Sequence, residues 1–132
     1  MSKQITKISD GEFESLVILP KKPTVVLFTS SWSGASKIVK PTIEAAAEKY
    51  SNKAAFYEMD IDDNTIIPQT FCVRNVPAIL TFAYGQVCGF HVGVINRDKL
   101  NESIEKITTQ GEALKNLVAF SKKLSARFGF RV

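Results

Sequence analysis

Two serines spaced three residues apart are the first candidates for chemistry in this sequence. Ser33 and Ser36 lie in the stretch Trp32-Ser-Gly-Ala-Ser36, which follows an apolar, β-branched run and precedes an expected helix. A serine hydroxyl becomes a nucleophile when a neighbouring base, held by a third group, activates it. The structural interpretation is that serine at a helix start caps the first backbone amides, which stabilises a helix by about 1 kcal/mol. We favour capping for both serines.

The elements that must hold this turn alternate between strand and helix. Residues 24–29 form a continuous apolar run, typical of a central strand covered on both faces. The spacing of Ser9 and Glu12 predicts a capping box at the first helix, and Asn96 is placed to cap the last one. We predict strands over residues 4–8, 24–29, 54–59, 78–82 and 86–92, and helices over residues 12–19, 33–50, 64–71 and 97–107. This order predicts an α/β fold with parallel central strands and an antiparallel hairpin at one side.

The turn and its neighbours resemble the thioredoxin family, whose active motif is Trp-Cys-Gly-Pro-Cys followed by lysine. The resemblance covers about residues 3–107, and the matching positions are Phe28, Lys37, Pro41, Asp60-Ile-Asp62, Val73-Arg-Asn-Val-Pro77, Gly85 and Gly93. It implies a thioredoxin fold, a three-layer α/β/α arrangement around a central mixed sheet. It also implies a thioredoxin-like domain over residues 1–107, followed by a basic amphipathic helical extension over residues 108–132.

The reactive atoms of that family are replaced at the matching positions. Thiol–disulfide exchange needs a thiolate to attack a sulfur and a second thiol to release the mixed disulfide. Ser33 and Ser36 occupy the two cysteine positions, and a hydroxyl can neither form nor break an S–S bond. Ala35 replaces the motif's proline, and Leu27 stands where the family has a buried aspartate that transfers protons. We therefore expect a buried Leu27, no catalytic turnover and no cofactor.

The remaining residues capable of chemistry do not restore an active site. His91, the only histidine, is expected on the last strand, which in this fold runs away from the turn, so Ser33 has no base and a hydrolase is disfavoured. Cys72 and Cys88 follow no spacing pattern, and we interpret them as free, inert thiols rather than a disulfide. So few candidate ligands predict no metal site.

The resemblance leaves a binding surface. It implies a cis peptide bond between Val76 and Pro77 and a backbone edge beside Trp32 that can pair with an extended peptide. The competing interpretation is that Trp32 only covers the turn and that Pro77 is inherited scaffold. The residues implied in recognition are Trp32, Ser33, Gly34, Ala35, Ser36, Val76 and Pro77.

The C-terminal residues carry the whole net charge of +4, because residues 111–132 hold five basic side chains against Glu112. We interpret this tail as an amphipathic helix that packs on its own domain, docks on a partner or a second copy of the chain, or lies on an anionic membrane surface. Nucleic acid is disfavoured because the tail has little aromatic interleaving and no groove-reading motif. The stripe expected to make the contact is Leu114, Leu117, Val118 and Leu124.

These observations predict a redox-inactive, thioredoxin-like binding module, an adaptor or chaperone-like subunit for a protein or peptide. The alternative is a disulfide oxidoreductase whose cysteines at positions 33 and 36 were replaced by serine. A deliberate knockout changes only those two positions, whereas Leu27 and Ala35 differ from the family as well. No apolar run opens the chain and no segment reaches the roughly 20 apolar residues of a membrane span, so we expect a cytoplasmic protein without a transmembrane segment.

Overall fold

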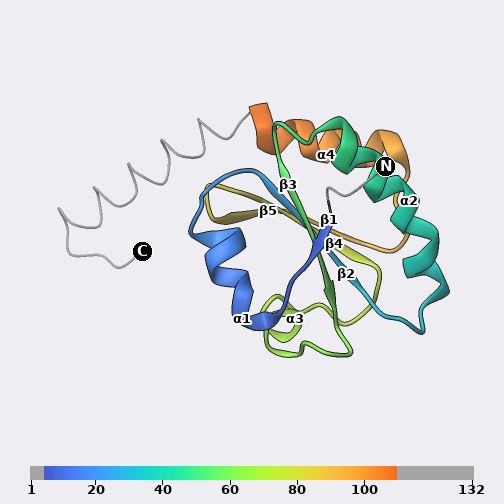
Figure 1. The fold of residues 1–132 in the computed structure, drawn as a ribbon. Coiled ribbons are helices and arrows are strands. Elements are labelled where there is room, and N and C mark those ends of the chain that lie inside the picture. The colour runs from blue at the N-terminus through green and yellow to red at the C-terminus, as the bar shows by residue number, and fades with distance from the viewer. Residues whose placement is uncertain (1–4, 110–132) are drawn as a thin grey trace, which may run out of the picture.

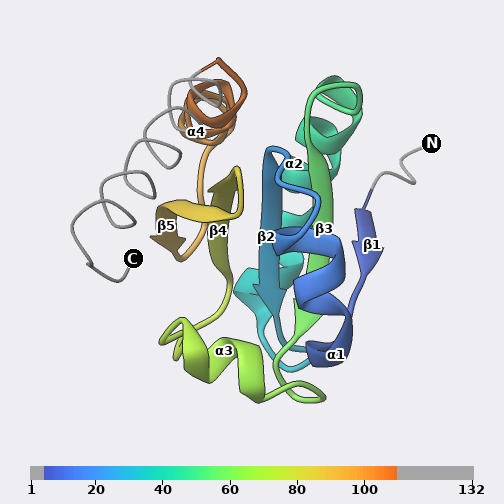
Figure 2. The same cartoon turned by 90° about the vertical axis from the view of Figure 1, so that its left-hand side faces the viewer.

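Every residue of β2 (Thr24–Thr29) is buried, which places this strand at the centre of the sheet. The computed structural model describes residues 5–109, and across them the sheet has five strands in the order β1-β3-β2-β4-β5 (Figure 2). The pairs β1–β3 and β2–β3 are parallel, whereas β2–β4 and β4–β5 are antiparallel, so the predicted mixed sheet is confirmed. The other strands are β1 (Ile5–Lys7) and β5 (Gln86–Val92) at the edges, and β3 (Ala55–Asp60) and β4 (Ala78–Ala83) beside β2.

Helices cover both faces of the sheet (Figure 1). Successive side chains of a strand point to opposite faces, so each strand supplies two separate cores. Leu27 and Phe56 enter the core beneath α2 and α4, whereas Phe28 and Phe82 enter the core beneath α1 and α3. This is the predicted three-layer arrangement. The helices are α1 (Asp10–Phe13), continued by the π-helical turn η1 (Glu14–Ile18), then α2 (Gly34–Lys49), α3 (Ile66–Thr70) and α4 (Arg97–Thr109).

The predicted bounds of the strands over residues 24–29 and 86–92 are confirmed, but α3 is shorter than the predicted 64–71. A carboxylate far away in the sequence sets its start. Asp10 accepts hydrogen bonds from the backbone N–H groups of Thr65, Ile66 and Ile67 at 3.0, 3.1 and 2.8 Å. A capping group on another element leaves no local signal, so the sequence pattern could not indicate where this helix begins.

Predictions about the C-terminal tail fall outside the described residues. The stripe Leu114, Leu117, Val118 and Leu124, and a dimer formed through it, therefore stay predictions. The last described helix, α4, continues to Thr109, two residues beyond the expected end at 107. Among residues 5–109, no helix is both long enough and apolar enough to span a bilayer.

Candidate functional site

Ser33 ends the turn after β2 and is the N-cap of α2. Its backbone is extended and its hydroxyl accepts a hydrogen bond from the Ser36 N–H at 3.1 Å, so the predicted cap is confirmed. The capping prediction is wrong for Ser36. Ser36 lies inside the helix, three residues after the N-cap, and its Oγ is buried without a hydrogen-bond partner within residues 5–109. Neither hydroxyl is placed as an activated nucleophile.

Leu27 is fully buried, as predicted, but a carboxylate is buried beside it. Glu58 on β3 is the direct partner of Leu27 across the sheet, and only 5% of it is exposed. Thr29 Oγ1 donates a hydrogen bond to Glu58 Oε2 at 2.8 Å, and Lys40 Nζ lies 3.3 Å from the same oxygen. We call Thr29, Lys40 and Glu58 the buried polar cluster. Sequence reasoning missed it, although a single carboxylate inside the apolar run 54–59 was a signal.

The buried polar cluster lies beneath the start of α2. Ser36 and Lys40 are four residues apart in this helix and therefore share one of its faces. Lys40 reaches Glu58 from that face, while 40% of its side chain remains exposed. The unpartnered Ser36 hydroxyl is thus on the side of α2 that faces the sheet and Glu58. An ion pair at this depth stabilises the packing of α2 on β3 only while both partners are present.

Trp32 stands on the surface at the tip of the turn, with 71% of its area exposed. Its indole N–H donates to Asp62 Oδ1 at 2.9 Å, and the Ser30 hydroxyl donates to Asp62 Oδ2 at 3.1 Å. The hydrogen bond from Trp32 is the main cause that lowers the pKa of Asp62, with smaller contributions from Ser30 and Ser31. One edge of the Trp32 ring is therefore tethered to Asp62, while most of its surface faces solvent.

Val76 and Pro77 lie at the same end of the sheet as the turn, where β2 ends and β4 begins. Their peptide bond is cis, and Ala78, the next residue, pairs with Phe28 four residues before Trp32. Pro77 is buried and Val76 is half-buried. The register therefore brings together the two segments from which the resemblance implied a groove.

Two exposed valines extend this edge and were missed from the sequence. Gly93 N–H donates to the Pro77 carbonyl at 2.8 Å, so the residues on either side of Gly93 flank Pro77. Val92 and Val94 are 50% and 52% exposed. We call Trp32, Val76, Pro77, Val92 and Val94 the groove surface. The sequence predicted a strand over residues 86–92 as part of a hairpin but gave no indication that its end would meet Pro77.

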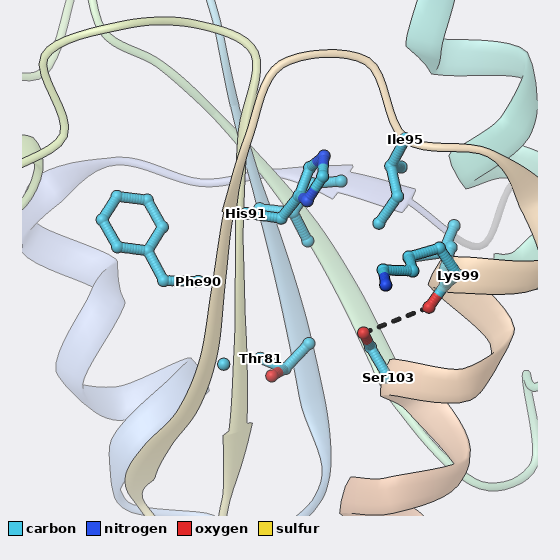
Figure 3. Close-up of a pocket in the computed structure, with 9 residues that line it drawn as sticks. Thr81, Phe90, His91, Ile95, Lys99 and Ser103 are labelled. Atoms are coloured by element: carbon cyan, nitrogen blue, oxygen red, sulfur yellow. Dashed lines mark hydrogen bonds between the residues drawn. The ribbon is translucent and has the colours of Figure 1, made fainter.

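His91 lies away from the turn. It is on β5 opposite Ile79 and lines a cavity against α4 (Figure 3). Cys72 and Cys88 are both free, as predicted, and both are exposed. Desolvation raises the pKa of Cys88, so its reactive thiolate is disfavoured. Within residues 5–109, no group of three or more His, Cys, Asp or Glu side chains is placed to hold a metal ion.

The tether of Trp32 predicts a pH-dependent fluorescence change. The folded-state pKa of Asp62 is below 3.8, its ordinary value, so the stabilisation from the ionised tether is complete above that value and is lost as the pH falls through the folded pKa. Trp32 is the only tryptophan. Its emission should stay constant from pH ~7 to ~4 and change below that range.

Asp62→Asn should abolish this transition, while far-UV circular dichroism reports any acid unfolding separately. A midpoint at or above the ordinary aspartate value, or an unchanged titration in the Asn variant, would contradict the tether.

Lys40 is the cation that pairs with Glu58, so we predict that replacing Lys40 alone lowers the stability of the protein. Lys40→Met leaves the Glu58 carboxylate buried without a counter-ion and should lower the free energy of unfolding by about 1–2 kcal/mol, a value reduced because Lys40 is partly exposed. Adding Glu58→Leu should recover most of that loss. Urea unfolding measures both, with Lys37→Met, an exposed lysine of the same helix, as the control. Additive effects of the two changes would show that Lys40 and Glu58 are not coupled.

Comparison with known proteins places this geometry in a family. The family model described as Thioredoxin matches residues 4–106. The chain is 30% identical over 103 residues to a thioredoxin of Haemophilus influenzae, with 78% of this chain and 96% of the relative covered. It is 30% identical over 105 residues to a thioredoxin of Acidithiobacillus ferridurans, covering 80% and 97%. It is 31% identical over 102 residues to the chloroplastic M-type thioredoxin of Brassica napus, covering 77% of this chain and 58% of the relative.

The structure gives the same result. The chain is similar to the Malassezia sympodialis thioredoxin Mala s 13, with a TM-score of 0.72, 26% identity, and 79% of this chain and 90% of that chain covered. The fold is therefore the thioredoxin fold that the sequence resemblance implied. With a family model that matches most of its length and relatives aligned over nearly their whole length, this chain belongs to the thioredoxin family.

Proposed function

We propose that this protein is a redox-inactive, thioredoxin-like binding module that holds an extended segment of a partner protein on the groove surface. One observation carries the proposal: hydroxyls stand at both positions where the family has thiols, while the surface around them remains apolar and open. Ser33 Oγ is engaged in the helix cap and Ser36 Oγ is buried. The two hydroxyls thus have structural rather than chemical roles, and the function left to this part of the protein is the binding of a partner.

The chemical part of the proposal follows from the requirements of exchange. A thiolate must attack one sulfur of a disulfide and a second thiol must release the mixed disulfide. In active members the helix N-terminus stabilises the thiolate by lowering its pKa. A serine hydroxyl stays protonated at neutral pH, and no S–S bond can form at either position. Cys72 lies between α3 and β4 and Cys88 on β5, so neither belongs to this turn, and both are free.

The binding part of the proposal rests on an open backbone edge. Within the described residues, neither the N–H nor the C=O of Val76 takes part in a hydrogen bond. An extended peptide that pairs with these two groups would add a short strand at this edge. Trp32 on one side and Val92 and Val94 on the other supply apolar contacts for its side chains. Tethered aromatic residues suit this role because little conformational entropy is lost when they are covered.

The second candidate is the disulfide oxidoreductase with both cysteines replaced by serine. It shares the fold and the groove surface, and the relatives named thioredoxin are consistent with either candidate. Leu27 and Ala35 favour the first candidate, because a two-residue knockout leaves these positions unchanged. The native coding sequence decides between the two, since cysteine codons at positions 33 and 36 would assign the oxidoreductase function to the natural protein.

We infer that the protein acts in the cytoplasm. Two exposed, unpaired cysteines fit a reducing compartment, where thiols persist. Fractionation of cells that produce the full chain tests this placement, and recovery in an oxidising compartment would contradict it.

The redox proposal predicts no turnover in an insulin reduction assay. With Cys72 and Cys88 alkylated, the protein should not accelerate dithiothreitol-driven reduction above the blank rate. Ser33→Cys combined with Ser36→Cys should produce measurable catalysis, because the helix N-terminus is already in place to stabilise a thiolate. Catalysis by the alkylated serine protein would overturn the proposal.

The groove proposal predicts that Trp32→Ala weakens binding to an array of extended decapeptides by about tenfold, since truncated aromatic anchors dominate interface energies. Leu19→Ala is the matched control, because Leu19 is exposed to a similar extent but precedes β2, whereas Trp32 follows it. The control should keep its affinity within about twofold. Equal affinities for the Trp32 variant and the wild type would exclude the groove surface as the binding site.

A further inference from the structure

A cavity of about 190 Å³ lies between the β4–β5 hairpin and α4, and the ring of Phe90 points away from the other labelled side chains (Figure 3). Neither the serine turn nor the groove surface lines it. Two strands, one helix and Ile95 of the loop that joins β5 to α4 supply its walls. Its lining includes Ile79, Thr81, His91, Ile95, Lys99 and Ser103.

A glycine keeps one wall of the cavity open. Gly89 on β5 pairs with Thr81 on β4, and a Cβ added at Gly89 would lie 2.7 Å from Thr81 Oγ1. Real Cβ atoms essentially never approach another heavy atom so closely. Any larger residue would push the Thr81 side chain aside, so glycine at this position preserves both the space and the access to the Thr81 hydroxyl.

The polar groups of the cavity include one that lacks a partner. His91 Nε2 is buried and has no hydrogen-bond partner within residues 5–109. A buried polar atom left unpaired costs free energy, which a ligand can recover by supplying the missing hydrogen bond. The Ser103 hydroxyl donates to the Lys99 carbonyl at 3.2 Å, so its lone pairs remain able to accept. Figure 3 shows His91 and Ile95 at one end of the cavity, Thr81 and Ser103 at the other, and Lys99 on the α4 side.

The charge of the cavity favours an anion. Among the lining residues within the described part of the chain, the one full charge is that of Lys99, and none is a carboxylate. Ile79, Ile95 and Leu100 make the remainder of the wall apolar. An apolar cavity of about 150 Å³ holds a benzene ring. A space of about 190 Å³ therefore suits a single ring or a branched chain that carries one small polar group.

We propose that this cavity binds a small carboxylate with an apolar body. The carboxylate receives hydrogen bonds from Lys99 Nζ and His91 Nε2–H, and the body lies against Ile79, Ile95 and Leu100. Ligand sites with this composition, a mostly apolar wall and a few convergent polar groups, are common in proteins. The cavity is separate from the groove surface, so this proposal does not depend on peptide binding there.

Benzoate is the probe for this site, and the full 132-residue chain is titrated with it while ¹⁵N–¹H correlation spectra are recorded. We expect saturable shifts at the amides of His91, Leu100 and Ser103, and a shift of the His91 Nε2 resonance in a long-range spectrum. Benzylammonium, which has the same ring with the opposite charge, should leave these signals unchanged. Shifts that never saturate, or equal responses to both compounds, would overturn the proposal.

Two lysine variants test the assignment of the charge. Lys99→Gln should weaken benzoate binding by about tenfold, because it removes the charge-assisted hydrogen bond. Lys106→Gln makes the same change on an exposed position of α4 that does not line the cavity, and should alter affinity by less than about twofold. Both changes are on the helix surface and leave the fold intact. Equal effects of the two variants would show that benzoate responds to net charge and not to this site.

Discussion

The burial of β2 on both faces is the constraint on which the rest of the structure depends. All six residues of this strand are buried, and its two neighbours, β3 and β4, run in opposite directions. The end of β2 therefore lies beside the end of β3 and the start of β4. The Ile61 N–H donates to the Thr29 carbonyl at 2.9 Å, which ties β3 to this edge just before the chain leaves the sheet. Because strand pairing sets this geometry, the serine turn and the Val76–Pro77 segment meet at one edge.

The pairing of β2 with β3 also places the buried carboxylate of Glu58 beside Leu27. The resemblance implies an aspartate at the position of Leu27, and Glu58, the direct neighbour of Leu27 on β3, places a carboxylate on the same face of the sheet. A carboxylate at that depth needs a donor and a cation, and Thr29 and Lys40 supply them. The core under α2 is otherwise apolar, so the buried polar cluster is an exception within it. The pair of Lys40 and Glu58 joins α2, the helix that Ser33 caps, to β3.

One strand serves both of the surfaces for which we propose a ligand. Alternate residues of β5 point to opposite faces, so His91 faces α4 while Phe90 and Val92 face the other side. His91 lines the cavity, and Val92, through the link between Gly93 and Pro77, borders the groove surface. The two sites are therefore back to back on the edge of the sheet. Each is built from residues on elements whose relative positions the hairpin fixes.

Local patterns in the sequence determined the elements of this protein, and the tertiary structure decided its site. The apolar run 24–29, the hairpin strand over 86–92 and the cap at Ser33 depend on neighbouring residues, and all three agree with the structure. The Lys40–Glu58 pair, the tether from Trp32 to Asp62 and the capping of α3 by Asp10 join residues far apart in the chain. Such contacts arise only when strand register brings two segments together. A single sequence records the residue types, but it does not record the register that selects their partners.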